Sequence, residues 1–282
     1  MSTTPQVWFI TGASSGFGRS MAEAALAAGH NVVATLRKPE VLNALQEQYP
    51  STLLVLQLDV MKPDQIEDAF AKAKATFGRI DVVFNNAGAA CVGEIEGTPI
   101  DKARLMFESL FWGAAQVSIT AVRYFREENK PAGGRLLQLS SKAGVQGVAG
   151  VGFYSATKFA LEGFSEALQQ EMDPKWNIKV TLIEPGPFKT GAAHNLEFLP
   201  IHPAYEHDLT LPGNMFRSFF TRALMGDPDK VSQVFLKLAQ LENPPLHFPI
   251  HEYAVMFTRK KAQELNEAAD KYESWSQGIY LD

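Results

Sequence analysis

The sequence predicts a doubly wound α/β domain with a parallel sheet, and three observations lead to that fold. Apolar runs of four to eight residues recur along the chain, and each is followed by a segment with a helical pattern. Continuous apolar runs are typical of strands that are covered by helices on both faces. The connections are short, which favours right-handed crossovers. A glycine-rich turn joins the first run to the first helical segment.

The strands are expected in chain order at residues 7–10, 31–36, 53–58, 80–84, 135–139 and 178–183. Residues 246–250 follow Pro244-Pro245 and are expected to form a last strand at an edge. Pro249 has no backbone N–H to donate, so a central position would be hard to accommodate.

Helix starts are indicated by capping patterns. Thr98 offers a capping hydroxyl before Pro99 and Asp101, and this pattern predicts a long helix through about residue 126. Asp227 and Pro228 predict a second helix in the same way. Its apolar face comprises Val231, Val234, Phe235, Leu238 and Leu241. A final helix is expected over residues 252–275.

No linker interrupts the alternating pattern, so residues 1–282 are predicted to form a single domain. Residues 191–226 break the pattern because they mix prolines with scattered apolar residues and show no regular periodicity. Such an insertion is usually mobile or a lid, and we favour a lid over the substrate site. The rest of the chain forms a C-terminal extension.

Composition excludes several classes of function. The net charge is −5 and no Lys/Arg-rich cluster occurs, which argues against nucleic-acid binding and against an anionic membrane surface. Residues 1–6 lack the features of a signal peptide, and no run reaches the roughly 18 apolar residues of a membrane span. A cytoplasmic protein without a membrane span is therefore expected.

The remaining polar residues outside the main motifs give weak signals. The single cysteine, Cys91, is expected to be a small buried residue, although its position close to residues 85–88 could also place it in the active site. Glu94 and Glu96 alternate with apolar residues and are expected to face solvent. The six histidines show no metal-ligand spacing, so no metal is predicted.

The glycine-rich turn is the first motif that suggests chemistry. Gly12, Gly16 and Gly18 lie between an apolar run and a helical segment in the spacing G-x-x-x-G-x-G. Glycines let the backbone approach a pyrophosphate, whose charge faces the N-terminal end of the helix. Taken alone, such a cluster is equally compatible with a plain turn.

A second motif places Ser141 13 residues before Tyr154, and Lys158 four residues after it. Positions four apart lie on one face of a helix, so Tyr154 and Lys158 are expected to be neighbours. The ammonium of Lys158 is expected to lower the pKa of Tyr154 from about 10 and to make it a general acid near neutral pH.

Together with Asn85-Asn86-Ala87-Gly88 and Pro185-Gly186, these motifs resemble the short-chain dehydrogenase/reductase family from about residue 6 to about residue 190. The resemblance implies a Rossmann-type domain in which Ser141, Tyr154 and Lys158 are catalytic. In that family the tyrosine protonates a carbonyl oxygen while hydride arrives from the nicotinamide. The family spacing favours Ser141 over Ser140.

The resemblance also implies a nicotinamide dinucleotide site. The expected cofactor-binding residues are Gly12, Ser14, Ser15, Gly16, Phe17, Gly18, Arg19, Arg37, Asp59, Val60, Asn86, Ala87, Gly88, Tyr154, Lys158, Pro185, Gly186 and Thr190. Asp59 is expected to contact the adenine, but it could instead cap the turn after its strand.

The charge pattern after the second strand favours NADP over NAD. An acid at this point typically binds the free ribose, whereas arginine accommodates a 2′-phosphate. Here Arg37 and Lys38 follow the strand, the first acid is Glu40, and Arg19 adds a second positive charge. Both arginine positions match those that the family uses for NADP(H).

One position departs from the family pattern. Leu110 stands where the family usually has an asparagine that holds a relay water, and a shift of one residue would place Ser109 there. The backbone carbonyl at this position could still hold the water.

The motifs and the charge pattern together predict an NADPH-dependent carbonyl reductase, or alcohol dehydrogenase in reverse, acting on an apolar small-molecule ketone or aldehyde. The C-terminal region resembles the steroid- and retinol-active branch.

Two other functions share part of this pattern. Leu110 favours a cofactor-binding regulatory protein with little turnover, whereas the intact catalytic set favours the enzyme. A sugar-nucleotide epimerase is disfavoured by the glycine spacing and the length. The sequence leaves the specific substrate, the reaction direction, and a homodimer or homotetramer open.

Overall fold

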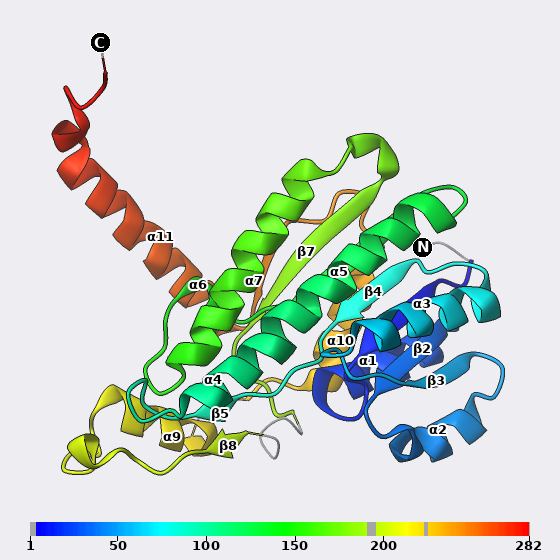
Figure 1. The fold of residues 1–282 in the computed structure, drawn as a ribbon, viewed down its shortest axis with the longest axis horizontal. Helices are drawn as coiled ribbons and strands as arrows, with labels where there is room; N and C mark the ends of the chain where they lie inside the picture. The colour runs from blue at the N-terminus through cyan, green and yellow to red at the C-terminus, as the bar shows by residue number, and fades with distance from the viewer. Residues whose placement is uncertain (1–3, 191–195, 223–224, 282) are drawn as a thin grey trace.

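The computed structural model describes residues 4–190, 196–222 and 225–281, and its centre is a seven-stranded parallel sheet in the order β3-β2-β1-β4-β6-β7-β9 (Figure 1). The predicted doubly wound α/β fold is confirmed. The sheet strands are β1 (Val7–Thr11), β2 (Asn31–Leu36), β3 (Leu53–Gln57), β4 (Val82–Asn85), β6 (Gly134–Leu139), β7 (Ile178–Pro185) and β9 (His247–Ile250).

Alternate side chains of the central strand enter two separate cores. Trp8 and Ile10 of β1 pack in the core under α1 (Gly16–Ala27) and α10 (Pro228–Ala239). Val7 and Phe9 pack on the other face, under α3 (Pro63–Phe77) and α5 (Gly113–Arg123). Because both faces are covered, the strands read as continuous apolar runs.

The long helix predicted from about residue 99 runs from Ile100 to Glu128. It comprises α4 (Ile100–Phe107), the π-helical turn η2 (Glu108–Trp112), α5 and the π-helical turn η3 (Tyr124–Glu128). The expected cap is wrong, because the Thr98 hydroxyl donates to the Glu94 carbonyl. By length and composition the helix could cross a membrane, but 56% of its apolar window is buried inside this fold.

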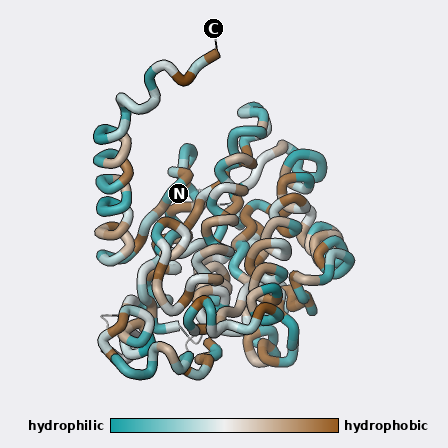
Figure 2. The backbone as a smooth tube through the Cα atoms, turned by 60° about the vertical axis from the view of Figure 1, so that its left-hand side comes forward, coloured by the Kyte–Doolittle hydropathy of each residue, from teal (hydrophilic) through white to brown (hydrophobic). Residues whose placement is uncertain are grey.

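The chain ends in a strand and a projecting helix. Strand β9 pairs in parallel with β7 at the edge of the sheet, with Pro249 opposite Glu184, as expected for an edge strand. Helix α11 (Glu252–Tyr272) then leaves the body of the molecule (Figure 1), and Ala254 is its one buried residue. Hydrophilic and hydrophobic residues alternate along it (Figure 2).

The segment expected to be irregular contains regular structure. Residues 191–195 and 223–224 lie outside the described residues. Between them are β8 (Glu197–Phe198), which pairs with β5 (Cys91–Val92), the short helix η5 (Pro203–Tyr205) and α9 (Pro212–Arg222). Figure 1 shows α9 and β8 close to the first turns of α4.

Glu94 does not face solvent, contrary to the expectation from the sequence. Its side chain is buried and forms an ion pair with Arg217 of α9 at 3.3 Å, and it accepts a hydrogen bond from the backbone N–H of His202. Glu94 alternates with apolar residues because it is buried against Arg217, and not because it faces solvent. The remaining elements are the long helix α7 (Gly152–Glu171) and the short elements η1 (Pro39–Leu42), α2 (Asn43–Gln48), α6 (Lys142–Val145), η4 (Pro174–Trp176) and η6 (Glu273–Ser276).

Candidate active site

A cavity of about 540 Å³ opens at the carboxyl ends of the central strands. This is where doubly wound folds bind ligands, since the loops that leave adjacent strands diverge there. Its wall includes most of the predicted cofactor site, namely Gly12, Ser14, Ser15, Gly16, Phe17, Arg37, Asp59, Val60, Asn86, Ala87, Gly88, Tyr154, Lys158, Pro185, Gly186 and Thr190.

Three positions between the end of β1 and the first turn of α1 require glycine. Gly12 and Gly16 have φ angles of +70° and +56°, in the left-handed region. A Cβ atom on Gly12 would lie 2.9 Å from the Cα of Ala87, and one on Gly18 would lie 2.3 Å from the carbonyl oxygen of Gly12. The backbone is therefore bare where α1 begins, which fits the phosphates of a dinucleotide.

The end of β4 is tied to this turn by hydrogen bonds. The Thr11 hydroxyl accepts from the backbone N–H groups of Asn86 and Ala87, both at 2.9 Å. The Asn86 amide donates to the Thr11 carbonyl at 2.8 Å. Asn85 points inward and donates to Gln138 at 2.7 Å. The role of Thr11 was missed, because a threonine at a strand end carries no signal of its own.

The three predicted catalytic residues come from two elements that face the cavity. Ser141 follows β6 and caps α6, where its oxygen accepts the Ala143 N–H at 3.1 Å. Tyr154 and Lys158 lie one turn apart on α7, with the Lys158 Nζ 5.8 Å from the centre of the Tyr154 ring. That ammonium donates to the Leu139 carbonyl at 2.6 Å. The structure thus brings Ser141, Tyr154 and Lys158 to one wall.

The electrostatics of this wall differ from the expectation. Burial raises the pKa of Tyr154, while the hydrogen bond with Ser141 lowers it in part. Burial also lowers the pKa of Lys158 to about 8, against a smaller opposite effect of Glu162. The expected lowering of the tyrosine pKa by Lys158 is therefore wrong for this structure. The ammonium is itself desolvated and is hydrogen-bonded to Leu139.

Two of the predicted cofactor residues do not line the cavity. Gly18 packs below the turn, against Gly12 and Asn86. The Arg19 side chain forms an ion pair with Glu23 one turn further along α1, at 2.5 Å. Asp59 lines the cavity, and its carboxylate also caps the turn after β3 by accepting the Met61 N–H at 3.1 Å.

Arg37 lines the cavity directly after β2, whereas Tyr154 lines it from α7. Its side chain is exposed, and no ion pair involves it among the residues that the structure describes. The nearest acid along the chain, Glu40, is also exposed and does not line the cavity. An anionic group bound beside β2 would therefore meet a positive charge.

The other half of the cavity is apolar. Leu110 lies in the π-helical turn and is buried with Cys91, Met106 and Leu199. Its Cδ2 would lie 2.1 Å from a Cβ atom on Gly88, so the leucine fills the space beside the Asn-Asn-Ala-Gly turn. Cys91 is buried but does not line the cavity, which agrees with its expected role as a small buried residue.

The remaining wall is built from segments far apart in sequence. Lys142 also lines the cavity, and its ammonium lies 4.3 Å from the centre of the Phe257 ring of α11. Ser109 also reaches the wall, where its hydroxyl donates to the Leu105 carbonyl. The apolar lining residues are Ala90, Val92, Leu105, Leu110, Val148, Val151, Phe188, Leu196 and Phe216.

The chain belongs to the short-chain dehydrogenase family, whose sequence profile matches residues 6–198. An uncharacterized oxidoreductase of Schizosaccharomyces pombe is 35% identical over 283 residues, which cover 100% of this chain and 94% of the relative. Human retinol dehydrogenase 8 is 32% identical and covers 87% of this chain and 81% of the relative. A crystal structure of a short-chain dehydrogenase from Streptomyces avermitilis, 34% identical, has a TM-score of 0.89 and covers 99% and 100% of the two chains.

These similarities establish an oxidoreductase of this family, which uses a nicotinamide dinucleotide. More distant structures share the fold with either form of the cofactor. A Burkholderia phymatum member, 19% identical with a TM-score of 0.77 and 95% and 96% coverage, is in complex with NAD. A serine dehydrogenase, 24% identical with a TM-score of 0.72 and 86% and 93% coverage, is complexed with NADP⁺. The fold alone therefore does not select between them.

Proposed function

We propose that this protein is an NADP(H)-dependent reductase or dehydrogenase that interconverts an apolar ketone or aldehyde and the corresponding alcohol. The observation that carries the proposal is one continuous cavity. It runs from the bare glycine turn and Arg37 past Tyr154 and Lys158 to an apolar chamber. The glycine turn and Arg37 suit the dinucleotide, Tyr154 and Lys158 suit the proton transfer, and the apolar chamber suits the substrate.

The side chains at the middle of the cavity divide the acid–base work. The Tyr154 hydroxyl is the general acid that protonates the carbonyl oxygen, and the raised pKa keeps this proton in place near neutral pH. Ser141 shares a hydrogen bond with Tyr154 and orients the same oxygen. Lys158 would hold the ribose of a bound cofactor and supply positive charge beside the phenolate. A bound nicotinamide dinucleotide supplies the hydride.

The choice of NADP(H) rests on charge. The 2′-phosphate of NADP(H) would bring negative charge next to the end of the second strand, where Arg37 is exposed and Glu40, the nearest acid along the chain, does not line the cavity. Asp59 is the acid in the lining, and it follows β3 rather than β2. Arg19 supports this less strongly, since its guanidinium must first leave Glu23. An acid at this point would instead favour the free ribose hydroxyls.

The substrate class follows from the chamber. Leu105, Val148 and Phe216 face it together with other apolar side chains, and few polar groups compete for the substrate. An apolar ketone or aldehyde gains free energy by leaving water there. The retinol dehydrogenase among the relatives is named for an apolar alcohol.

The proposal is tested by measuring kcat/KM with NADPH and with NADH over a panel of aliphatic and cyclic ketones and aldehydes. We expect turnover with NADPH that rises with the apolar size of the carbonyl compound, and much weaker turnover with NADH. Tight NADPH binding without turnover of any compound would favour the regulatory alternative, for which Leu110 is the supporting feature.

A further inference from the structure

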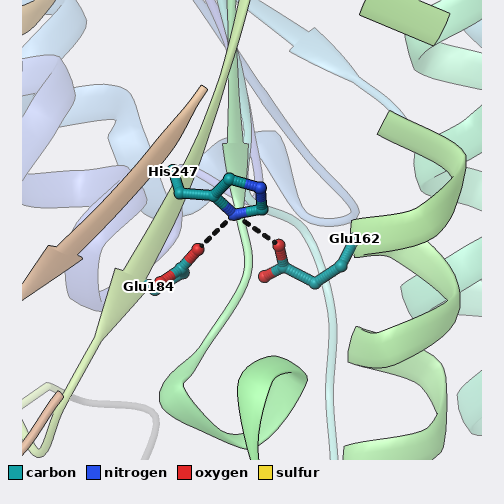
Figure 3. Close-up of side chains that lie close together, drawn as sticks. All are labelled: Glu162, Glu184 and His247. Atoms are coloured by element: carbon teal, nitrogen blue, oxygen red, sulfur yellow. Dashed lines mark hydrogen bonds and ion pairs between the residues drawn. The ribbon is translucent and has the colours of Figure 1, made fainter. Parts of the chain in front are cut away.

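A cluster of titratable side chains lies behind the catalytic wall, and the proposed reaction chemistry does not use it. Glu162 follows Lys158 by one turn on α7, Glu184 is on β7 and His247 is on β9 (Figure 3). Glu162 is only 6% exposed and Glu184 is fully buried, whereas the His247 side chain is 45% exposed. The cluster therefore runs from the catalytic helix to solvent.

The imidazole of His247 is shared between two carboxylates. Its Nδ1 lies 2.8 Å from Oε1 of Glu184 and 3.5 Å from Oε2 of Glu162, and both carboxyl groups point at it in Figure 3. Its Nε2 lies 3.5 Å from Glu166 on the same helix as Glu162. The Ser140 hydroxyl donates to the other oxygen of Glu162. One ring nitrogen thus faces two acids.

The cluster is short of hydrogen-bond donors. Oε2 of Glu162 and Oε2 of Glu184 are buried and have no hydrogen-bond partner. A single N–H at Nδ1 serves one carboxylate at a time, and a buried carboxylate without a donor is strongly disfavoured. The arrangement is stable when one carboxyl group carries a proton, and that proton can pass between Glu162, Glu184 and His247.

Lys158 and Glu162 are four positions apart on α7, so their side chains lie on the same face of the helix, beside this cluster. Burial lowers its pKa to about 8, and the negative charge of Glu162 opposes this shift. Burial raises the pKa of Glu162 to about 7, and Glu184 adds to the rise, while the hydrogen bond from Ser140 and the charges of His247 and Lys158 oppose it. Burial raises the pKa of Glu184 as well. Lys158 and Glu162 therefore both change protonation near neutral pH.

The same three residues also have the composition of a cation site, since their ligand-type atoms lie within 4.8 Å of one another. Two observations favour a proton instead. The Nδ1 atom, which a metal would need, is already engaged by Glu184 at 2.8 Å. The ammonium of Lys158 lies one helical turn away and would repel a second cation.

We propose, on the basis of the carbonyl reduction argued above, that Glu162, Glu184 and His247 form a proton route from solvent to Lys158. Leu110 has no side-chain group that could hold a relay water on the cavity side, which favours a second source for the proton that Tyr154 loses. In each reduction the Tyr154 hydroxyl gives one proton to the carbonyl oxygen, and the phenolate regains one from the Lys158 ammonium.

The remaining steps return each side chain to its starting protonation state. One proton enters from solvent, and no electrons are transferred. Neutral Lys158 turns from the Leu139 carbonyl and takes a proton from the Glu162 carboxyl group. The Glu162 carboxylate takes one from the His247 imidazolium, with Glu184 holding the ring in place, and His247 takes one from hydronium or a protonated buffer molecule in the solvent, which becomes water or the buffer base. These three are positioning residues, because they act through Lys158 and touch neither the carbonyl compound nor the nicotinamide.

The test compares His247→Ala, Glu162→Gln and the control Glu171→Gln, an exposed residue at the end of the same helix. For the wild type we expect kcat for NADPH-dependent reduction to fall as pH rises through about 7, because Glu162 loses its proton. Glu162→Gln should lose this step. His247→Ala should lower kcat about tenfold, with rescue by added imidazole in proportion to the imidazolium concentration.

NADPH affinity should stay within about twofold in all three variants, and Glu171→Gln should match the wild type. A purely structural role for the cluster would not give rescue by imidazole. Absence of rescue, an unchanged pH profile in Glu162→Gln, or loss of activity on treatment with EDTA would overturn the proposal.

An infrared titration of the full-length protein separates this inference from the proposed function. A protonated carboxyl band that is present at pH 6, disappears near pH 7 to 8 and is missing in Glu162→Gln is expected whether or not a substrate has been found. A wild type that shows this band without turnover contradicts the proposed function and leaves the shared proton in place. Absence of the band contradicts the shared proton itself.

Discussion

Single side chains decide the chemistry of each end of the cavity. In the proposed function Arg37 provides charge for the 2′-phosphate and Tyr154 provides the proton, while Leu110 fills the space beside Gly88 with an apolar surface. None of these roles needs movement of the backbone. The residue scale is therefore where the proposed cofactor preference and the acid–base chemistry can be altered without disturbing the fold.

Replacing Arg37 by aspartate should reverse the cofactor preference. The carboxylate would repel a 2′-phosphate and would accept hydrogen bonds from free ribose hydroxyls. We expect the Kd for NADPH to rise at least about tenfold, with a gain in NADH affinity, since one lost charge-assisted contact is worth about 1.4 kcal/mol or more. Lys38→Asp, at the neighbouring exposed position, is the control. An unchanged NADPH affinity would show that the phosphate is bound elsewhere.

Replacing Leu110 by asparagine should destabilise the protein. Leu110 is buried among Cys91, Met106 and Leu199, so the amide would lose water without gaining a partner. We expect a cost of about 1–3 kcal/mol and a lower kcat, measured by denaturant unfolding and by initial rates. Leu110→Met keeps the volume and should cost less than about 1.5 kcal/mol. A rise in kcat with asparagine would mean that proton supply at the cavity limits turnover.

At the scale of elements, α9 and β8 are held against the mouth of the cavity by a small number of polar contacts. Arg217 of α9 reaches both the Leu199 carbonyl, at 2.6 Å, and the buried carboxylate of Glu94. Phe216, the preceding residue, lines the cavity. We propose that this segment acts as a lid over the substrate chamber, with the Glu94–Arg217 pair as its attachment.

Neutralising Glu94 should loosen that attachment. In Glu94→Gln the Arg217 guanidinium stays largely buried without its charge partner, a change that costs about 3–5 kcal/mol in comparable pairs. We expect KM for the carbonyl substrate to rise severalfold while NADPH affinity stays unchanged. Glu96→Gln is the matched control, because among the described residues Glu96 accepts a hydrogen bond from the exposed hydroxyl of Tyr205 and has no other side-chain partner. An equal effect of both substitutions on KM would argue against the Glu94–Arg217 pair as the attachment of the lid.

The whole molecule shows which features a sequence can predict. The strands of the main sheet were predictable because burial on both faces produces apolar runs, and the Ser141–Tyr154–Lys158 spacing indicated one helix face. Strands β5 and β8 are two residues each, too short for any period to be visible. The burial of Glu94 depends on Arg217, and the Glu162–His247 contact joins α7 to the edge strand, so no local pattern reveals either.

The projecting helix α11 contributes little to the fold. Beyond Phe257, which meets Lys142, its side chains are largely exposed. Removal of residues 262–282 should therefore shift Tm by no more than about 2 °C and leave NADPH affinity unchanged, because few buried contacts are lost. Thermal unfolding and cofactor titration check this. A large fall in Tm would show that the helix is buried in an assembly.

The central claim is that Tyr154 is the acid of an NADPH-dependent carbonyl reductase, and Tyr154→Phe tests it most directly. The substitution removes one hydroxyl proton and leaves the ring to pack. With the best carbonyl substrate from the panel, we predict that kcat falls about 10²–10⁴-fold. NADPH affinity measured by fluorescence titration should stay within about twofold. A variant that retains more than about a tenth of the wild-type rate would contradict the account.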